Sequence, residues 1–486
     1  MFINLKTMKK LISMTVLALL VVFATTGCKK SYTITVKSNN DAWGSVTGSG
    51  TYKDGETVTI SAIPAQGFYF NGWNDGNTEN PRSIVVSGNA EYIATFSDTP
   101  GGGTEGALEI SGSISTNTTW PDRGLAVDYL IDGPLYLENN ALLTIEPGVT
   151  IMFTGVNGAI FVGENAGLCM KGTADKHIVL TGPTNNPNKG AWNTVQVRSN
   201  RSDNQFEYVD FFNGGSYETP VVEVPGQISI KHCTVNGSLG NGIDVSGTLS
   251  AFENNTIKNV DKYPLVLGTY QMLNFLGNGN TYTNNGRNMI YLNAYWFNNA
   301  GIYETIKFRN QGIPYYAPEG MNLQSAQDVM RAYEGVEIVF GHNTEIYVGE
   351  EGLIEVQGTE SAPVIFRGEQ DETGYWEGIT YASQRTASSK LVNFMMMNAG
   401  KHDEAALRMG EDARFTLNNV NINGSNGYGL KIAIPYDWDT EQYDFSNYHV
   451  TASNLTFANC AQGNIYEINK DQVYSSWPEN KKLARK

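Results

Sequence analysis

Short apolar runs separated by glycine and asparagine turns recur along most of the 486-residue chain. The runs are rich in Val, Ile and Phe and are too short for helices, so they predict strands. Asparagines that close such phrases follow one another at intervals of 23, 23, 25 and 26 residues, at Asn213, Asn236, Asn259, Asn284 and Asn310. A repeat of this length indicates a solenoid, and the leucine-rich frame that shares the period is missing. We therefore predict a parallel β-helix with three short strands per coil.

Asparagine suits the corners of such coils for two physical reasons. Its side chain tolerates a left-handed backbone, and it can hydrogen-bond to the next coil. We therefore expect the asparagines that close the repeated phrases to lie at corners.

The repeated unit itself occurs twice, at residues 148–242 and 335–429. The first copy opens with GVTIMF and the second with GVEIVF, an offset of 187 residues that returns near the end of both copies. Trp192 in GAWNTV then corresponds to Trp376 in GYWEGI. A feature kept in both copies is more often structural than functional. We expect these two tryptophans to pack at corners, with ligand contact as the alternative.

The N-terminus carries a targeting pattern. Two lysines precede an apolar run and small residues, as in a secretory signal over residues 1–27. The Gly-Cys pair that ends at Cys28 resembles a bacterial lipobox, although Thr25 stands where a large aliphatic residue is usual. The resemblance implies lipidation of Cys28, a tether at 28–30 and a lipoprotein of the cell envelope, surface-exposed at the outer membrane. A plain signal peptide is the alternative, and Met8 is an alternative start.

Residues 31–97 form a separate module of alternating strands and glycine turns. The order G-x-V-x-G-x-G-x-Y, then G-E-x-V-x-I-x-A-x-P-x-x-G-[FY]-x-F-x-G-W, then A-x-F closely resembles the divergent InlB B-repeat family. The matching residues are Gly44, Val46, Gly48, Gly50, Tyr52, Gly55, Val58, Ala62, Pro64, Gly67, Phe70, Trp73, Ala94 and Phe96. The resemblance implies a small β-rich extracellular spacer or adhesive domain. So small a domain needs a core aromatic, which we expect to be Trp73, with sugar stacking as the alternative.

A Gly-rich linker at 98–106 leads into residues 107–470. There ENNALLTIEPGVTI and GTADKHIVLTG resemble the right-handed parallel β-helix repeats of bacterial surface lipoproteins. The resemblance implies a pectin-lyase-like fold, which serves lyases, glycosidases and adhesins alike and so does not decide function. The predicted fold class is all-β, a right-handed parallel β-helix (solenoid) preceded by a small β-rich InlB B-repeat-like module. Residues 471–486 form a basic C-terminal tail.

Acidic charge narrows the range of partners. The formal net charge of −16 becomes −19 when the three lysines of the signal are removed. Such a chain repels nucleic acid, and we expect no nucleic-acid partner. The same charge disfavours anionic polysaccharides unless cations bridge the contact.

Cysteine and histidine usage argues against metal and disulfide chemistry. Cys169, Cys233 and Cys460 lie on apolar strand patterns, and we expect core-packed free thiols. No zinc-binding spacing occurs, and the chain has five histidines. We predict no cofactor and no metal site, with calcium in acidic loops as an alternative to solvated carboxylates. The acidic residues in question are Asp371, Glu372, Glu377, Asp437 and Asp439.

No carboxylate constellation typical of a lyase or a glycosidase stands out, and we predict no catalytic residue. Asp210 aligns with Asn393 in the second copy and has no evident partner. Two loops carry aromatic or acidic residues suited to stacking on and hydrogen-bonding a neutral sugar. These candidate ligand-binding residues are Tyr295 and Trp296 in one loop, and Tyr436, Asp437, Trp438 and Asp439 in an inserted loop. Anchoring of the loops on the solenoid is the alternative.

Together these features predict a non-catalytic cell-surface lipoprotein that presents a β-helix for binding or adhesion. Its partner would be a polysaccharide or another surface component. The rival hypothesis is a carbohydrate-active enzyme, a glycoside hydrolase or polysaccharide lyase, for which the charge favours a neutral glycan. A purely structural surface-layer component is a third hypothesis.

Overall fold

The computed structural model describes residues 30–65, 68–97, 104, 106–184, 186–297, 305–325, 328–349, 351–382, 388–401, 404–411, 413–434, 436–437, 439–443 and 449–477. The chain divides into two compact units, residues 1–105 and 106–486. Regular structure in the described residues is almost entirely strand. The exceptions are three short 3-10 helices, η1 (Ser216–Glu218), η2 (Tyr270–Phe275) and η3 (Ile468–Lys470).

Two small sheets enclose the core of the first unit. Their strand orders are β3-β1-β7-β5 and β2-β4-β6, and every pair is antiparallel except β1 with β7. The strands are β1 (Ser31–Ser38), β2 (Gly44–Thr47), β3 (Gly50–Lys53), β4 (Thr57–Pro64), β5 (Tyr69–Trp73), β6 (Arg82–Val85) and β7 (Ala90–Ser97). Trp73 is 3% exposed in this core, and its Nε1 donates to the carbonyl oxygen of Glu79 at 2.9 Å. The prediction of a core aromatic is confirmed.

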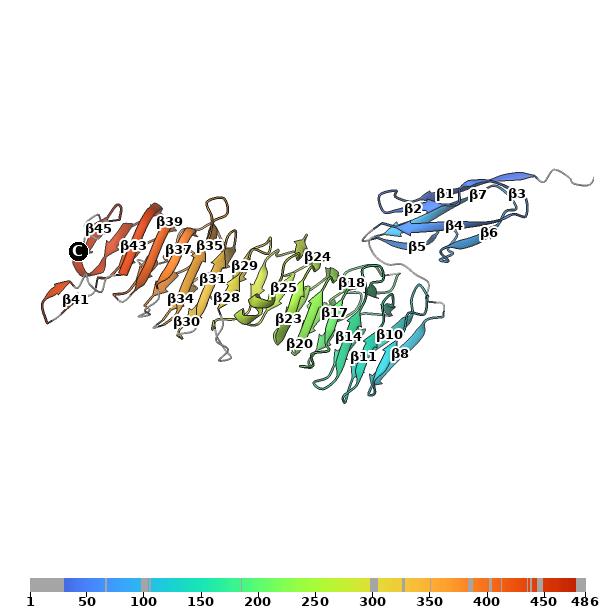
Figure 1. Ribbon diagram of the computed structural model, residues 1–486, viewed down its shortest axis with the longest axis horizontal. Helices are drawn as coiled ribbons and strands as arrows, with labels where there is room; N and C mark the ends of the chain where they lie inside the picture. Colours follow the sequence, from blue (N-terminus) through green and yellow to red (C-terminus); the bar gives the residue numbers. More distant parts are fainter. Residues whose placement is uncertain are drawn as a thin grey trace, which may run out of the picture. The chain divides into compact units, whose positions relative to one another are not determined.

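The second unit is a stack of coils, in which nearly all strands pair in parallel with a strand of the next coil (Figure 1). Three columns of strands form its first half. Column I contains β12 (Thr150–Phe153), β15 (Ile178–Thr181), β18 (Val209–Gly214), β21 (Thr234–Ser238), β24 (Thr256–Val260) and β26 (Thr281–Thr283). Column II contains β13 (Ala159–Val162), β16 (Val195–Val197), β19 (Val222–Val224), β22 (Ile243–Val245), β25 (Leu265–Leu267) and β27 (Ile290–Leu292). Column III contains β9 (Thr118–Trp120), β11 (Leu142–Ile145), β14 (Gly167–Lys171), β17 (Gln205–Glu207), β20 (Gln227–Lys231) and β23 (Thr248–Glu253).

Longer strands bracket these columns at both ends of the unit. Strands β8 (Leu108–Ile114) and β10 (Tyr129–Leu137) begin columns I and II together. Column II continues through β29 (Tyr315–Ala317), β32 (Glu337–Phe340) and β35 (Val364–Gly368). Column III is taken up again by β28 (Ile306–Phe308), β31 (Val329–Tyr333) and β34 (Leu353–Gln357). Both end in β37 (Ser389–Met397), β39 (Arg414–Ser425) and β43 (His449–Cys460). The predicted parallel β-helix is confirmed.

A fourth column begins in the middle of the stack. Column IV contains β30 (Met321–Leu323), β33 (Glu345–Val348), β36 (Gly378–Tyr381), β38 (Ala405–Met409), β40 (Tyr428–Ile432), β44 (Gly463–Glu467) and the antiparallel β45 (Gln472–Tyr474). A parallel bridge between Trp296 and Asn322 of β30 adds one segment before the first strand of this column. The hairpin of β41 (Tyr436–Asp437) and β42 (Gln442–Tyr443) follows β40.

The two copies of the repeated unit are therefore not in rotational register. Strands β12 and β32 open the copies with equivalent sequences, yet β12 lies in column I and β32 in column II. Likewise β13 lies in column II, whereas its equivalent β33 lies in column IV. Equivalent outward residues of the two copies thus face different sides of the solenoid. Column I ends at β26 and column IV begins at the bridge of Trp296 with Asn322, so the change of side falls between these two.

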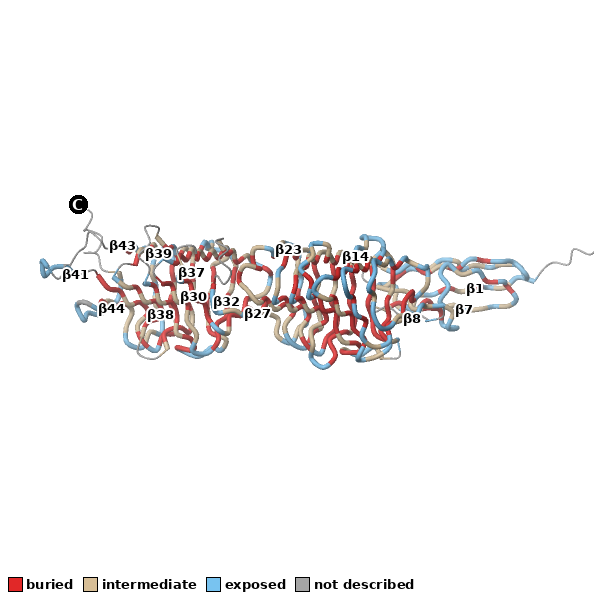
Figure 2. Tube along the Cα trace, turned by 90° about the horizontal axis from the view of Figure 1, so that it is seen from below, coloured by how far each residue is buried: buried red, intermediate tan, exposed pale blue. Residues whose placement is uncertain are grey.

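Buried residues recur along the strands of the second unit (Figure 2), and the apolar ones among them form one core. Trp192 and Trp376 are both 0% exposed, and they stack on Phe153 and Phe340 with ring centroids 4.4 and 4.2 Å apart. Each indole Nε1 donates to a backbone carbonyl oxygen, at 2.7 and 2.9 Å. The predicted corner packing is confirmed for both copies.

Three of the five periodic asparagines adopt the expected left-handed backbone. Asn213, Asn259 and Asn284 have φ of 58°, 59° and 55°. At Asn236 and Asn310 the left-handed position falls on a nearby glycine instead. The amide of Asn259 donates to Asn236 Oδ1 at 2.8 Å, which links successive coils as predicted.

One inward-facing asparagine, Asn255, is 1% exposed and binds two neighbouring backbone groups. Its Oδ1 accepts from the backbone N–H of Cys233 at 2.9 Å, and its Nδ2 donates to the carbonyl oxygen of Ile230 at 3.0 Å. Asn255→Ala leaves both groups buried without their partner, at about 1–3 kcal/mol each. We expect the free energy of unfolding to fall by about 2–4 kcal/mol, measured by urea denaturation. The exposed control Asn165→Ala should change the free energy of unfolding by less than about 0.5 kcal/mol. Equal losses of stability in the two variants would contradict the structural role of Asn255.

The three cysteines among the described residues are free thiols, and of these only Cys233 is in the core. Cys233 is buried, as predicted. The prediction was wrong for Cys169 and Cys460, which are partly exposed. Cys169 lies between the inward residues Leu168 and Met170, so the alternation of the strand directs its side chain outward.

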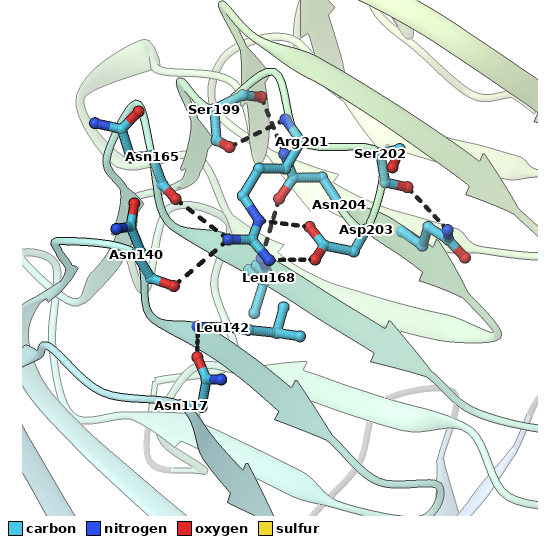
Figure 3. Close-up of polar contacts among 11 residues, drawn as sticks. Asn117, Asn140, Leu142, Asn165, Leu168, Ser199, Arg201, Ser202, Asp203 and Asn204 are labelled. Carbon is cyan, nitrogen blue, oxygen red and sulfur yellow. Dashed lines mark hydrogen bonds and ion pairs between the residues drawn. The ribbon is translucent and has the colours of Figure 1, made fainter.

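Arg201 connects three coils at a corner after β16 (Figure 3). Its Nη1 donates to the carbonyl oxygens of Asn140 and Asn165 at 3.4 and 3.5 Å, and its Nε donates to Asp203 at 2.8 Å. The hydrogen bond to Asp203 raises the pKa of Arg201. A guanidinium held in this way is a structural clamp and a poor proton acceptor.

Candidate functional site

One outward-facing row of side chains runs along column II. The middle residue of each strand points outward, because the residues on either side of it are buried. Parallel pairing places Tyr136, Phe161, Gln196, Glu223, Asp244, Val266, Tyr291 and Tyr316 side by side in this order. We call these eight residues the column II row. Seven steps of about 4.8 Å give it a length of about 34 Å.

Two carboxylates occupy the middle of the row. Glu223 pairs with Asp244 on the next coil. Gln196 Nε2 donates to Glu223, and Arg198 Nε donates to Gln196 Oε1 at 2.7 Å. Asn241 Nδ2 donates to Asp244 Oδ2 at 3.2 Å, whereas Asp244 Oδ1 is buried and has no hydrogen-bond partner among the described residues. Burial, reinforced by the charge of Glu223, raises the pKa of Asp244 to about 6.

The acid pair predicts a pH dependence of stability. The pKa of Asp244 in the folded chain, about 6, lies above its ordinary value of 3.8. The contribution of Asp244 to stability is therefore fully present below about pH 4 and lost as the pH rises through about 6. We expect Asp244→Asn to unfold at a higher temperature than the wild type at pH 8 and to lose this advantage at pH 4. The exposed control Asp175→Asn should show no such trend, and a pH-independent difference for Asp244→Asn would contradict the prediction.

An aromatic platform lies on the β10 side of the acid pair. The rings of Tyr136 and Phe161 stack with centroids 5.4 Å apart and an interplanar angle of 22°. Together with Gln196 and Arg198 they line a hollow of about 340 Å³. Tyr136 is exposed and Phe161 half-buried, so part of the stacked pair is accessible to solvent. We call this pair the first platform.

A second platform lies beyond the acid pair, at Tyr263, Tyr291 and Tyr316. The ring centroids of Tyr263 and Tyr291 are 4.9 Å apart, and those of Tyr291 and Tyr316 are 5.7 Å apart. The Arg287 guanidinium lies 5.2 and 5.0 Å from the rings of Tyr263 and Tyr316. Glu369 forms an ion pair with Arg287 and accepts a hydrogen bond from the Tyr316 hydroxyl at 2.7 Å. The charge of Arg287 is thus neutralised within the platform.

Comparison of the two copies shows that the acid pair is not required by the fold. The row equivalent to Gln196, Glu223 and Asp244 lies in column IV, where parallel pairing aligns Thr380, Arg408 and Lys431. Basic residues thus replace the two carboxylates. They are held by ion pairs of their own, Arg408 with Glu345 at 3.3 Å and Lys431 with Glu404 at 2.8 Å.

Two expectations about Asp210 are wrong. Pairing of Val179 with Asp210 and of Ile365 with Met395 makes Met395, not Asn393, the equivalent residue. Asp210 also has a partner, since its Oδ2 lies 2.9 Å from His177 Nδ1. This hydrogen bond raises the pKa of His177.

The structure does not bring the predicted ligand-binding loops together. Tyr295 and Trp296 are 38% and 48% exposed at the start of column IV, where their backbone pairs with Asn322. Tyr436, Asp437 and Asp439 belong to the hairpin after β40, five strand steps or about 24 Å farther along. Asp437 Oδ1 accepts from the backbone N–H of Asp439 at 2.9 Å, as in a turn cap. Trp438, like Cys28, lies outside the described residues.

The acidic residues considered for calcium include Asp371, whose side chain is hydrogen-bonded within the protein. Its Oδ1 accepts a hydrogen bond from Asn398 Nδ2 at 3.0 Å. Within the described ranges, no three His, Cys, Asp or Glu side chains gather closely enough to hold a metal ion. Of the helices in the same ranges, none has the length and apolar character needed to cross a membrane.

Sequence reasoning missed the column II row, although a signal for it exists. Four of its eight residues, Gln196, Glu223, Asp244 and Tyr291, are the middle letters of the triplets VQV, VEV, IDV and IYL. Glu223 and Asp244 are 21 residues apart, which is close to the coil period. Searching for charged residues at the centre of successive apolar triplets would have found the pair.

Two family models match parts of the chain. Residues 34–100 match the divergent InlB B-repeat domain, and residues 112–220 match the pectate-lyase like beta helix domain. Both predicted resemblances are confirmed in these segments. The second match covers Tyr136, Phe161 and Gln196 and ends before Glu223. Neither a curated protein nor a solved structure matches the chain significantly.

Proposed function

We propose that the chain presents its β-helix as a carbohydrate-binding surface and that a glycan lies along the column II row. The observation that carries this proposal is the arrangement of two aromatic platforms in register on either side of a hydrogen-bonding centre. Aromatic faces stack on the apolar faces of sugars, and carboxylates and amides bind their hydroxyls. The match to a pectate-lyase-like β-helix also suggests a carbohydrate-related role.

The remainder of the proposal concerns how the surface is displayed. We propose that Cys28 carries a lipid that tethers the chain to the cell envelope, at the outer surface. The InlB B-repeat module would then act as a spacer between the anchor and the β-helix. The protein would serve adhesion to a polysaccharide or another surface partner, without cleaving it.

Affinity electrophoresis of the purified chain in gels containing neutral and acidic polysaccharides tests the binding. Retardation by at least one polysaccharide is expected, and it should be weakened by Phe161→Ala. Tyr217→Ala, which removes an aromatic side chain 67% exposed outside the row, is the matched control and should bind normally. Unretarded migration in every gel would refute the proposal.

The acid pair favours hydrolysis of the bound glycan as a second candidate. Glycoside hydrolysis uses two carboxyl groups, one of which must be protonated near neutral pH. Asp244, with a pKa of about 6, would supply the proton at mildly acidic pH, beside an ionised Glu223. New reducing ends released by the wild type but not by Glu223→Gln or Asp244→Asn would establish it. Absence of release from a polysaccharide that binds would leave binding alone.

A further inference from the structure

We infer that the column II row selects uncharged linear glycans that run along the solenoid axis and rejects glycans that carry carboxylates. This inference rests on the proposed function and specifies its ligand. It depends on three observations: the length between the platforms, the charges around the acid pair, and the replacement of that pair in the second copy.

The two platforms require one linear ligand to cross the acid pair. Phe161 and Tyr291 are separated by five strand steps, about 24 Å along the axis. Glu223 and Asp244 lie between them in the same row. A glycan that stacks on both platforms therefore places its middle sugars over the two carboxylates.

The cations around the acid pair are already engaged. Lys262 Nζ lies 2.7 Å from Glu218 Oε2, and Arg287 is paired with Glu369. Arg198 donates to Gln196, at the side of the row nearer the first platform. Gln196 is neutral, so Arg198 keeps its charge there, and Lys262 also lowers the pKa of Asp244. When both carboxylates are ionised, Glu223 and Asp244 still outnumber the one guanidinium that has no acidic partner among the described residues. The centre of the row is then net negative, which repels a carboxylate on a sugar and accepts hydrogen bonds from hydroxyls.

The second copy shows that the strand frame accepts the opposite charge. Arg408 and Lys431 occupy the positions equivalent to Glu223 and Asp244, and the residues on either side of them are likewise apolar and buried. Packing therefore does not demand carboxylates in the first copy. The residues of the second copy therefore indicate the double substitution that tests the role of the two carboxylates, Glu223→Arg combined with Asp244→Lys.

Matched polymers isolate the effect of charge. A soluble β-glucan, a galactomannan and a galactan would each be compared with the same polymer after oxidation of its primary hydroxyls to carboxylates. We expect the wild type to bind a neutral form at least about tenfold more tightly than its oxidised form at low salt, with a smaller ratio at high salt. Glu223→Arg with Asp244→Lys should bring the ratio to about one or below.

Two controls separate the possible failures. Asp175→Lys with Glu360→Arg makes the same change of net charge at exposed positions outside the row and should leave the ratio unchanged. If Glu223→Arg with Asp244→Lys shows no folding transition in a thermal melt, Glu223→Gln with Asp244→Asn replaces it. This neutral variant should lower the ratio of the affinities for the neutral and the oxidised polymer. This inference alone is overturned if the wild type binds the neutral and the oxidised polymer equally. It is also overturned if the variants of Glu223 and Asp244 leave the ratio of the two affinities unchanged. Binding of neither form refutes the proposed function as well.

Discussion

Phe161→Ala combined with Tyr291→Ala is expected to lower the affinity for a bound neutral polysaccharide by about a hundredfold. Each substitution removes one aromatic anchor, worth about 1–2 kcal/mol when it is desolvated by a ligand. The two anchors hold one ligand from both ends, so their contributions multiply in the binding constant. Titration calorimetry with oligosaccharides of increasing length measures the effect.

The length dependence makes this prediction specific. In the wild type, affinity should rise until an oligosaccharide reaches both platforms, about 24 Å apart. Either single variant should bind long and short oligosaccharides with similar affinity. Tyr217→Ala is the control for the loss of an exposed ring. If the double variant binds long oligosaccharides like the wild type, the platforms are not the binding surface.

Trp192→Ala and Trp376→Ala are each expected to lower the free energy of unfolding by about 3–5 kcal/mol. Both side chains are fully buried, stack on a phenylalanine and donate a hydrogen bond to a backbone carbonyl. Alanine leaves a large cavity and an unsatisfied carbonyl oxygen. Urea denaturation measures the loss.

Location provides a second test of these two variants. Solenoid stability is approximately a sum over neighbouring coils, so each substitution should loosen the coils around it first. Hydrogen exchange should therefore increase in one copy and not in the other. Trp296→Ala, an exposed tryptophan, should change stability by less than about 0.5 kcal/mol. Losses no larger than this control would contradict the structural role of the buried pair.

Local features of the sequence predicted the fold because they recur in every coil. The asparagine period, the alternating apolar runs and the duplication each indicate stacked short strands. Trp192 and Trp376 could be assigned to the core because a large apolar side chain kept in both copies of a repeat has few other uses. Trp73 could be assigned to a core because so small a domain needs a core aromatic. Cys169 and Cys460 escaped this reasoning because an apolar neighbourhood in the sequence does not say which face of a strand a residue occupies.

The candidate site could not be predicted in the same way. Glu223 and Asp244 are neighbours only because their strands pair in parallel across a coil, and coil lengths vary along the chain. The change of side between β26 and the bridge of Trp296 with Asn322 likewise depends on how strands pair across coils. Equivalent sequences such as those of β13 and β33 fold alike locally, yet they face different sides of the solenoid.

The sequence by itself therefore determined a two-unit, all-β architecture and its buried aromatic positions. These depend on periodicity, burial and turn chemistry, which are local properties of the chain. Tertiary structure alone decided which outward residues share a row and which charges they meet there. Those outcomes depend on strand register, where a shift of one residue moves a side chain to the opposite face.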